Sequence, residues 1–130
     1  MTDRGYKRSE KLKGKSGIDR LFREGKWHTG GSLRVIVLPD EGGKMPKVGV
    51  SVSKKFLKKA VDRNRAKRLL RETYRLNKAL FLEAFGVSSS MLFWVSRKLP
   101  KNQAEVEVDF IKLCEKIKRQ KAAEEDETNA

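Results

Sequence analysis

The sequence predicts an α/β (α+β) fold, a two-layer sandwich with one mixed sheet, a long basic helix and two further helices. Two stretches alternate apolar with small or polar residues, as strands do, and three others place apolar residues on one helical face. These patterns are interspersed along 130 residues, which is enough for one domain with a modest core. We expect this domain at residues 16–118, between a flexible basic segment at 1–15 and a disordered acidic tail at 119–130.

A short amphipathic helix is predicted first. Ser16 suits its N-cap, and Gly25 suits its end. Ile18, Leu21 and Phe22 fall on one face of this helix and give it an apolar side. The following residues, KWHTGG, are expected to form a loop.

Two strands are predicted next, at residues 32–39 and 47–55. In the first, SLRVIVLP, Arg34 and Ile36 share the face that is turned away from the core. In the second, KVGVSVSKK, small residues alternate with valines, so one face is flat and polar and could accommodate a ligand. The core-facing positions of the two strands are Leu33, Val35, Val37, Val48, Val50 and Val52.

The second half of the chain predicts a long helix, a strand and a last helix. The long helix is expected to begin with Asp62 as its N-cap and to run to about Leu82. Residues 91–96, MLFWVS, form an apolar strand, and residues 104–117 form an amphipathic helix. Cys114 lies on the apolar face of that helix, so we expect a buried structural thiol.

The long helix and the four lysines just before it carry most of the net positive charge of the chain. From Lys54 to Lys78 there are eleven lysines and arginines against two acids, which gives +9 of the net +14. Like charges at i,i+4, such as Lys67 and Arg71, destabilise an isolated helix, so their repetition indicates a polyanionic partner. Nucleic acid is the first candidate and an anionic membrane surface the second. Arginine can hold phosphate oxygens bidentately, which further favours nucleic acid.

The stretch VSVSKKFLKKAVDRNRAKRLLRETYR resembles the signature of the bacterial ribonuclease P protein subunit. Arg63, Asn64 and Arg65 match its Arg-Asn-Arg core, and the matching strand end is Ser-Val-Ser-Lys-Lys at 51–55. The likeness extends in order and spacing over roughly residues 12–117. The basic positions that follow the core are Lys67, Arg68 and Arg71.

The resemblance implies a sandwich of the type seen in a ribosomal protein domain. It also implies a subunit of an endoribonuclease that removes the 5′ leader of precursor tRNA. A cytoplasmic location is expected from the sequence itself, which shows no run of about 18 apolar residues and no signal-peptide pattern. In that family the catalyst is a separate RNA with bound Mg²⁺, and the protein positions the substrate. The implied partners are ribonuclease P RNA and precursor tRNA, without a membrane or a small-molecule substrate.

The resemblance assigns residues to two surfaces and none to catalysis or to a metal. The contacts to the catalytic RNA are Lys55, Lys58, Lys59, Arg63, Asn64, Arg65, Lys67, Arg68, Arg71 and Arg75. The leader-binding cleft would consist of Ile18, Phe22, Arg34, Ile36, Ser51, Ser53 and Lys54. Many family members have aromatic residues where this chain has Ile18 and Ile36, which removes base stacking at those two positions.

Other functions fit the sequence less well. An independent nuclease would need clustered carboxylates or a base beside a nucleophile, whereas the acids are scattered and His28 has no evident partner. A structural protein of ribosomal or other folded RNA fits the charge and remains the alternative. A DNA-compacting protein is disfavoured because no groove-reading element is evident. Membrane binding is weakest because the core needs the leucines of the basic helix.

Overall fold

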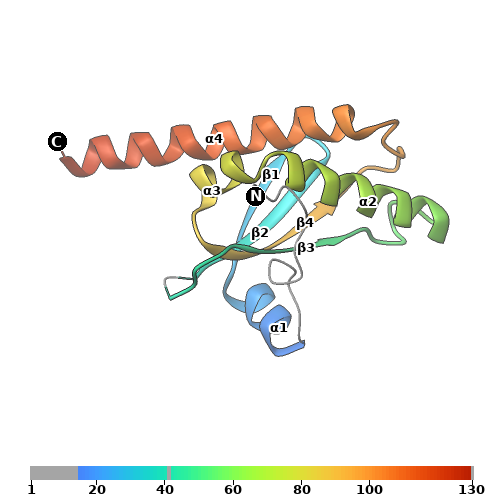
Figure 1. The fold of residues 1–130 in the computed structure, drawn as a ribbon, viewed down its shortest axis with the longest axis horizontal. Coiled ribbons are helices and arrows are strands. Elements are labelled where there is room, and N and C mark those ends of the chain that lie inside the picture. The colour runs from blue at the N-terminus through green and yellow to red at the C-terminus, as the bar shows by residue number, and fades with distance from the viewer. Residues whose placement is uncertain (1–14, 41, 130) are drawn as a thin grey trace, which may run out of the picture.

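The structure is a computed structural model that describes residues 15–129 except residue 41, so the segment 1–14 lies outside the described residues. The element order is helix, three strands, two helices, strand and helix (Figure 1). The elements are α1 Lys15–Glu24, β1 Lys26–Gly30, β2 Leu33–Pro39, β3 Lys47–Ser51, α2 Ala60–Leu76, α3 Lys78–Phe85, β4 Ser88–Trp94 and α4 Gln103–Asn129.

The four strands form one mixed sheet in the order β1-β2-β4-β3. β1 with β2 and β2 with β4 are antiparallel, whereas β3 and β4 are parallel. Parallel neighbours require a crossover connection, and α2 and α3 supply it. Helices α2, α3 and α4 cover one face of the sheet, and α1 lies on the opposite side (Figure 1). This arrangement confirms the predicted α+β class with a mixed sheet. No helix in the described residues combines the length and apolar character needed to cross a membrane.

The main core lies between the sheet and helices α2, α3 and α4. Leu33 pairs with Trp94, and Val35 pairs with Leu92, and all four side chains are buried on this face. The predicted inward face of β2 is therefore confirmed. Cys114 of α4 is fully buried, and burial raises the pKa of its thiol to about 12, so it is a structural and unreactive residue as expected.

The edge strand β1 was not predicted, because residues 26–31 read as a loop. Gly31 and Ser32 form the two-residue connection of a hairpin, and Gly31 adopts φ = 58°. Ser32 donates its backbone N–H to Asp109 Oδ2 of α4 at 3.1 Å, which fixes the turn against the helix. The pair Gly31-Ser32 between two extended runs is a hairpin signal. Gly30 directly before this pair makes the stretch resemble an ordinary loop.

Replacing Gly31 with alanine is expected to destabilise the protein by about 2 kcal/mol. A left-handed backbone costs a residue with a Cβ roughly 1–2 kcal/mol, and that Cβ would lie 2.5 Å from Asp109 Oδ1. The change should lower the urea midpoint of unfolding without changing its slope. Gly42→Ala is the matched control, because no atom lies within 4 Å of a Cβ built there. Equal midpoints for the two variants would contradict this account of the turn.

Two predicted helix starts are wrong. α1 begins at Lys15, so Ser16 lies inside the helix instead of preceding it. α2 begins at Ala60, and Lys59 occupies the N-cap position without a side-chain capping hydrogen bond. Asp62 lies in the first turn, where its carboxylate stabilises the helix through the macrodipole instead of capping it.

The last strand is shifted toward the N-terminus, to Ser88–Trp94 instead of residues 91–96, and the last helix is longer than predicted. β4 begins at Ser88 because the buried hydroxyls of Ser88 and Ser90 lie 3.1 Å apart and satisfy each other inside the sheet. α4 continues to Asn129, so residues 119–129 are helical instead of forming the expected disordered tail. Alanine, glutamate, lysine and glutamine dominate this segment, and all are strong helix formers.

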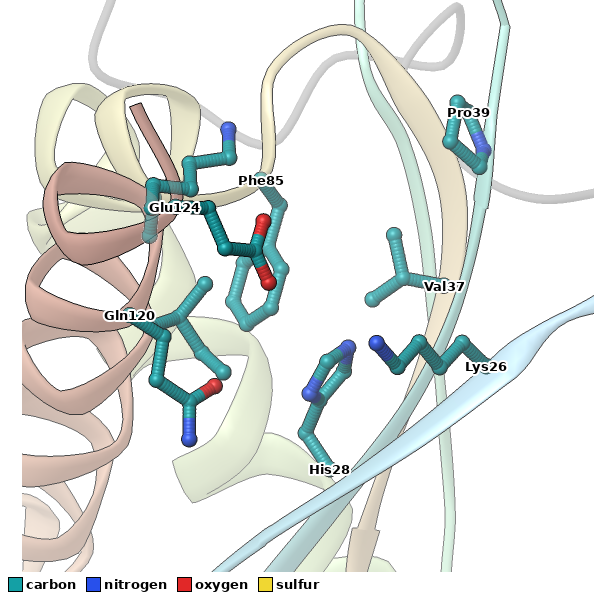
Figure 2. A pocket seen from close by; sticks show the side chains of 10 residues that line it. Lys26, His28, Val37, Pro39, Phe85, Gln120 and Glu124 are labelled. Atoms are coloured by element: carbon teal, nitrogen blue, oxygen red, sulfur yellow. The ribbon is translucent and has the colours of Figure 1, made fainter. Parts of the chain in front are cut away.

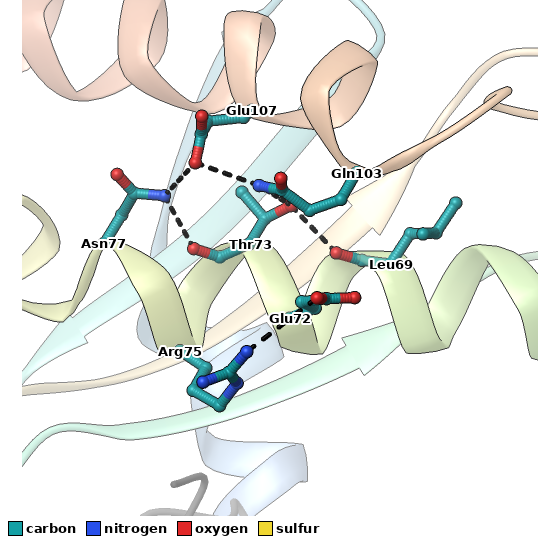
Figure 3. A network of polar contacts seen from close by, with 7 residues as sticks. All are labelled: Leu69, Glu72, Thr73, Arg75, Asn77, Gln103 and Glu107. Atoms are coloured by element: carbon teal, nitrogen blue, oxygen red, sulfur yellow. Dashed lines mark hydrogen bonds and ion pairs between the residues drawn. The ribbon is translucent and has the colours of Figure 1, made fainter. Parts of the chain in front are cut away.

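The predicted long helix is divided at Asn77, where the backbone leaves the helical region. The Asn77 side chain donates to Thr73 O at 2.8 Å and to Glu107 Oε2 of α4 at 2.9 Å (Figure 3). Gln103 donates to the same Glu107 oxygen at 2.9 Å. The break between α2 and α3 therefore depends on a partner thirty residues away in the sequence, which no local pattern reveals.

Glu107→Gln is expected to lower the free energy of unfolding by about 1 kcal/mol at pH 7, since hydrogen bonds to charged groups are the stronger ones. The bonds from Asn77 and then from Gln103 hold the pKa of Glu107 below its ordinary value. A lowered native pKa stabilises the fold above the unfolded-state pKa, and this contribution is lost as the pH falls through the native value. The difference between wild type and variant should therefore shrink below about pH 4.

Denaturant unfolding from pH 7 to pH 3 measures this difference. Glu115→Gln, at an exposed position of the same helix, is the control and should leave stability nearly unchanged. A difference for Glu107→Gln that stays constant over this range would contradict a charged Glu107 at the junction.

Candidate nucleic-acid interface

One side of α2 is an exposed strip of positive charge, here called the basic face of α2. The buried side packs against β3, β4 and α4 through Ala66, Leu70, Thr73 and Tyr74. The outward residues are exposed at positions 64, 65, 68 and 71 and half-buried at 63, 67 and 75. The basic face comprises the seven predicted helix contacts Arg63, Asn64, Arg65, Lys67, Arg68, Arg71 and Arg75.

Most of this charge has no acidic partner among the residues that the structure describes. Arg75 Nη2 lies 3.8 Å from Glu72 Oε1, a weak pairing at the C-terminal end of the face. Arg68 and Arg71 make no hydrogen bond or ion pair with any residue in the described part of the chain. Because like charges crowd the same side of one helix, an anion bound there would relieve their mutual repulsion.

Residues 52–59 connect β3 to α2, and residues 53–59 are here called the lysine loop. β3 ends at Ser51 because Ser53 turns the chain: its carbonyl accepts from Phe56 N and Leu57 N at 3.1 and 3.2 Å. Its hydroxyl accepts from Lys55 N at 3.1 Å, so the predicted leader contact Ser53 has a structural role in the turn. Lys54, Lys55, Lys58 and Lys59 are all exposed on this loop.

Two arginines of the Arg-Asn-Arg core bond to the protein itself. Arg63 Nη1 donates to Leu57 O at 3.0 Å and to Lys58 O at 2.7 Å. Arg65 Nη2 donates to Lys101 O in the loop before α4 at 3.1 Å. The sequence predicted both as RNA contacts, whereas the structure gives each an additional role in holding a neighbouring loop.

The sheet face that is turned away from the core carries an exposed aromatic cluster, defined by Phe22, Trp27 and Phe93. The ring centroids of Trp27 and Phe93 lie 5.4 Å apart, and Phe22 lies 6.0 Å from each of them. Arg34 places its guanidinium carbon 4.3 Å from the centre of the Trp27 ring. Phe22 and Trp27 remain 44% and 39% exposed, which leaves ring surface on which a base can stack.

The cluster brings together some of the predicted cleft residues. Phe22 is part of it, Arg34 lies on Trp27, and Ser51 pairs with Phe93 on the neighbouring strand. Ile18 is half-buried on α1. The aromatic cluster therefore lies beside two of the predicted leader contacts, Arg34 of β2 and Ser51 of β3.

Ile36 is not a surface residue, which corrects the prediction. It is fully buried beneath α1, as is Leu21 on the facing side of the helix. A Cβ at Gly25, directly after α1, would lie 2.6 Å from Ile36 Cγ1, so the helix approaches β2 closely at this point. Ile36 therefore anchors α1 to the sheet, and no base can reach it in this arrangement.

A hollow of about 460 Å³ lies at the opposite end of the same sheet face, beside the start of α1. Its lining includes Arg20 of α1, Lys47 of β3 and Ser89 of β4. Asp40 also lines this hollow, and Arg20 Nε lies 2.6 Å from Glu24 Oε2, so carboxylates partly offset its positive charge. On this sheet face the aromatic cluster, which suits base stacking, is therefore the clearer candidate contact for a single strand.

Sequence reasoning missed two members of the aromatic cluster. The sequence places Trp27 in the predicted loop 26–31 and Phe93 in the apolar strand 91–96, and neither is assigned to the cleft. Trp27 and Phe93 come into contact only through the antiparallel register of the sheet. This register sets Trp27 opposite Ile36 and Phe93 opposite Arg34. The sequence of β4, SSSMLFW, does not alternate, so it gives no signal that Phe93 faces away from the core, although burial along the folded strand does alternate.

No catalytic constellation is present in the described residues. His28 lies on β1, not in a loop, and its ring contacts Phe85 at a centroid distance of 5.5 Å. Figure 2 shows it beside Lys26, in an apolar hollow of about 210 Å³. Burial first, and then the charges of Lys26 and Lys116, lower the pKa of His28, so it is neutral at pH 7. The described chain also holds no cluster of three or more potential metal ligands.

The fold and site together define a class: a small α+β protein with a basic helix face and an exposed aromatic surface, which is typical of nucleic-acid-binding proteins. The model of the Ribonuclease P family matches residues 6–118. The chain therefore belongs to the ribonuclease P protein family, and the family prediction from the Arg-Asn-Arg signature is confirmed.

Curated relatives support this assignment, and a solved structure shares the fold. The ribonuclease P protein component of Porphyromonas gingivalis is 42% identical over 102 residues, 74% of each chain. That of Chlorobaculum tepidum is 42% identical over 84 residues, 61% of this chain and 54% of its own length. The match thus spans about half of the latter relative. The fold is shared with the RNase P protein from Thermotoga maritima, with a TM-score of 0.67 and 24% identity over 85% of this chain and 96% of that one.

Proposed function

We propose that this chain is the protein subunit of a ribonuclease P holoenzyme that removes the 5′ leader of precursor tRNA. The observation that carries the proposal is the uncompensated basic face of α2 in a member of this family. Ribonuclease P RNA would lie against this face and the lysine loop. Phosphate contacts of this kind supply most of the affinity of a protein for a nucleic acid and make it salt-dependent.

The leader would lie on the sheet face beside α1. Bases would stack on Phe22, Trp27 and Phe93, and Arg34 and Lys54 would meet phosphates at either side of the cluster. The lysine loop follows β3 directly, so it connects the leader surface with the basic face of α2. One small domain could therefore hold the substrate and the catalytic RNA at the same time.

The role proposed for this chain is binding and orientation. A holoenzyme of this kind requires Mg²⁺ to supply the charge stabilisation of phosphodiester hydrolysis. The described residues do not gather a ligand set for such an ion, so we assign no metal contact and no chemical step to this protein. Precursor tRNA, the substrate in this proposal, is synthesised in the cytoplasm, and we propose the same location for the chain. The alternative of a structural RNA-binding protein is not favoured by the family assignment.

Cross-linking from each RNA tests the two surfaces separately. Precursor tRNA with 4-thiouridine in its leader should cross-link to peptides of α1, β1 and β4 within the reconstituted holoenzyme. Ribonuclease P RNA carrying the same photoreactive base should cross-link to peptides of α2 and the lysine loop. Leader cross-links found on α2 instead would contradict the assignment of the two surfaces.

A further inference from the structure

Arg63 occupies an unusual position among the cations of the basic face. Its Nη1 atom contacts two consecutive carbonyl oxygens of the lysine loop, Leu57 O at 3.0 Å and Lys58 O at 2.7 Å. The side chain is half-buried, and Arg63 N also donates to Lys59 O at 3.1 Å as α2 begins. The guanidinium therefore faces the protein backbone, unlike Arg68, which is exposed five residues further along the helix.

The loop held in this way carries three of the predicted RNA contacts. Leu57 is buried in the main core, and Lys58 and Lys59 follow it directly. Among the described residues no other donor reaches the carbonyls of Leu57 and Lys58, because the backbone N–H groups of this turn donate to Ser53 and Lys59 instead. A single donor that satisfies both carbonyls restricts the backbone from which the lysines extend.

The loop forms one wall of a hollow of about 420 Å³ at the start of α2. Arg97, which follows β4, lines the same hollow and was not predicted as an RNA contact. Asp62 is the only acidic residue in the lining, so cations dominate it. The four cations of the hollow are Lys55, Lys58, Lys59 and Arg97.

We propose that Arg63 is a positioning residue that acts on the RNA through the lysine loop, and that Arg97 completes the cationic site which this loop forms. The inference rests on the proposed function and deepens it, because it distinguishes Arg63 from the arginines that contact phosphate directly. Fixing the loop before binding removes part of the entropy cost of ordering long lysine side chains on RNA.

The first test compares Arg63→Ala with Arg68→Ala in the free protein and in RNA binding. Hydrogen exchange at the amides of Phe56 and Leu57 should accelerate at least about tenfold in Arg63→Ala and stay unchanged in Arg68→Ala. The slope of log affinity against log salt should fall by about one for Arg68→Ala, as for one lost phosphate contact, and by about two or more for Arg63→Ala. Arg63→Lys keeps the charge on a shorter side chain. It should restore less than half of the slope that Arg63→Ala loses.

The second test is a mutant cycle on ribonuclease P RNA. In a background with Lys55, Lys58 and Lys59 replaced by alanine, Arg63→Ala should cost little further affinity, whereas Arg68→Ala should keep its full effect. Arg97→Ala should weaken binding in the wild-type background about as much as one of the lysine changes. Additive losses for Arg63, unchanged exchange at Phe56 and Leu57, or full rescue by Arg63→Lys would overturn the positioning role. Unchanged affinity in Arg68→Ala and in the triple lysine variant would instead overturn the proposed function itself.

Discussion

Replacing Arg68 and Arg71 together with alanine should lower the affinity for ribonuclease P RNA by about 100-fold at moderate salt. Both side chains are exposed on the basic face, and neither has a partner within the described residues, so both are free to contact phosphate. Two charge-assisted hydrogen bonds of about 1.5 kcal/mol each give this factor. The fold should persist, because the buried side of α2 is unchanged.

Filter binding over a range of salt concentrations measures this effect. The affinities of the wild type and of the double variant should converge as the salt concentration rises. Lys112→Ala with Arg119→Ala is the matched control, because it removes the same charge from exposed positions of α4. The control should reduce affinity by no more than a few-fold, through net charge alone. Equal losses for the two pairs would mean that RNA responds to total charge and not to the basic face of α2.

Phe22→Ala should weaken binding of precursor tRNA to the holoenzyme by about 1–3 kcal/mol, which is the range for one lost base stack. Phe22 contacts both Trp27 and Phe93, so the change also disturbs the ring against which the next base would stack. Mature tRNA, which has no leader, should bind the variant as tightly as the wild type. Phe22→Leu preserves the apolar contact without the ring and should show most of the same loss.

Leu82→Ala on α3 is the control for this experiment, because Leu82 is 44% exposed, as Phe22 is, and its helix lies on the other side of the sheet (Figure 1). It should affect neither substrate. Equal losses for precursor and mature tRNA in Phe22→Ala would contradict stacking of the leader and point to a general disturbance of α1.

The features that the sequence predicts correctly are those that depend on local spacing. The basic face of α2 follows from the 100° turn per residue, and the inward face of β2 from the alternation of Leu33 and Val35 with Arg34. Both require only neighbours a few residues away. The signature residues from Arg63 to Arg71 also lie within one helix, so the family could be inferred before any packing was known.

The features that were missed depend on contacts between distant segments. The break at Asn77 requires Glu107, and the burial of Ile36 requires α1 to pack across β2. The aromatic cluster forms only when the register of β1, β2 and β4 is set, and Arg63 shows its second role only when the lysine loop folds back on α2. The physical reason is the same in each case, since tertiary contacts override local propensity.

The most direct test of the central claim is cleavage of precursor tRNA by a bacterial ribonuclease P RNA at low Mg²⁺. The reaction is run with the RNA alone, with this protein alone, and with both together. The account predicts cleavage at the mature 5′ end only in the complete mixture, and reduced rescue by the Arg68→Ala, Arg71→Ala variant. Tight, salt-sensitive RNA binding without any rescue, or cleavage by the protein alone, would contradict it.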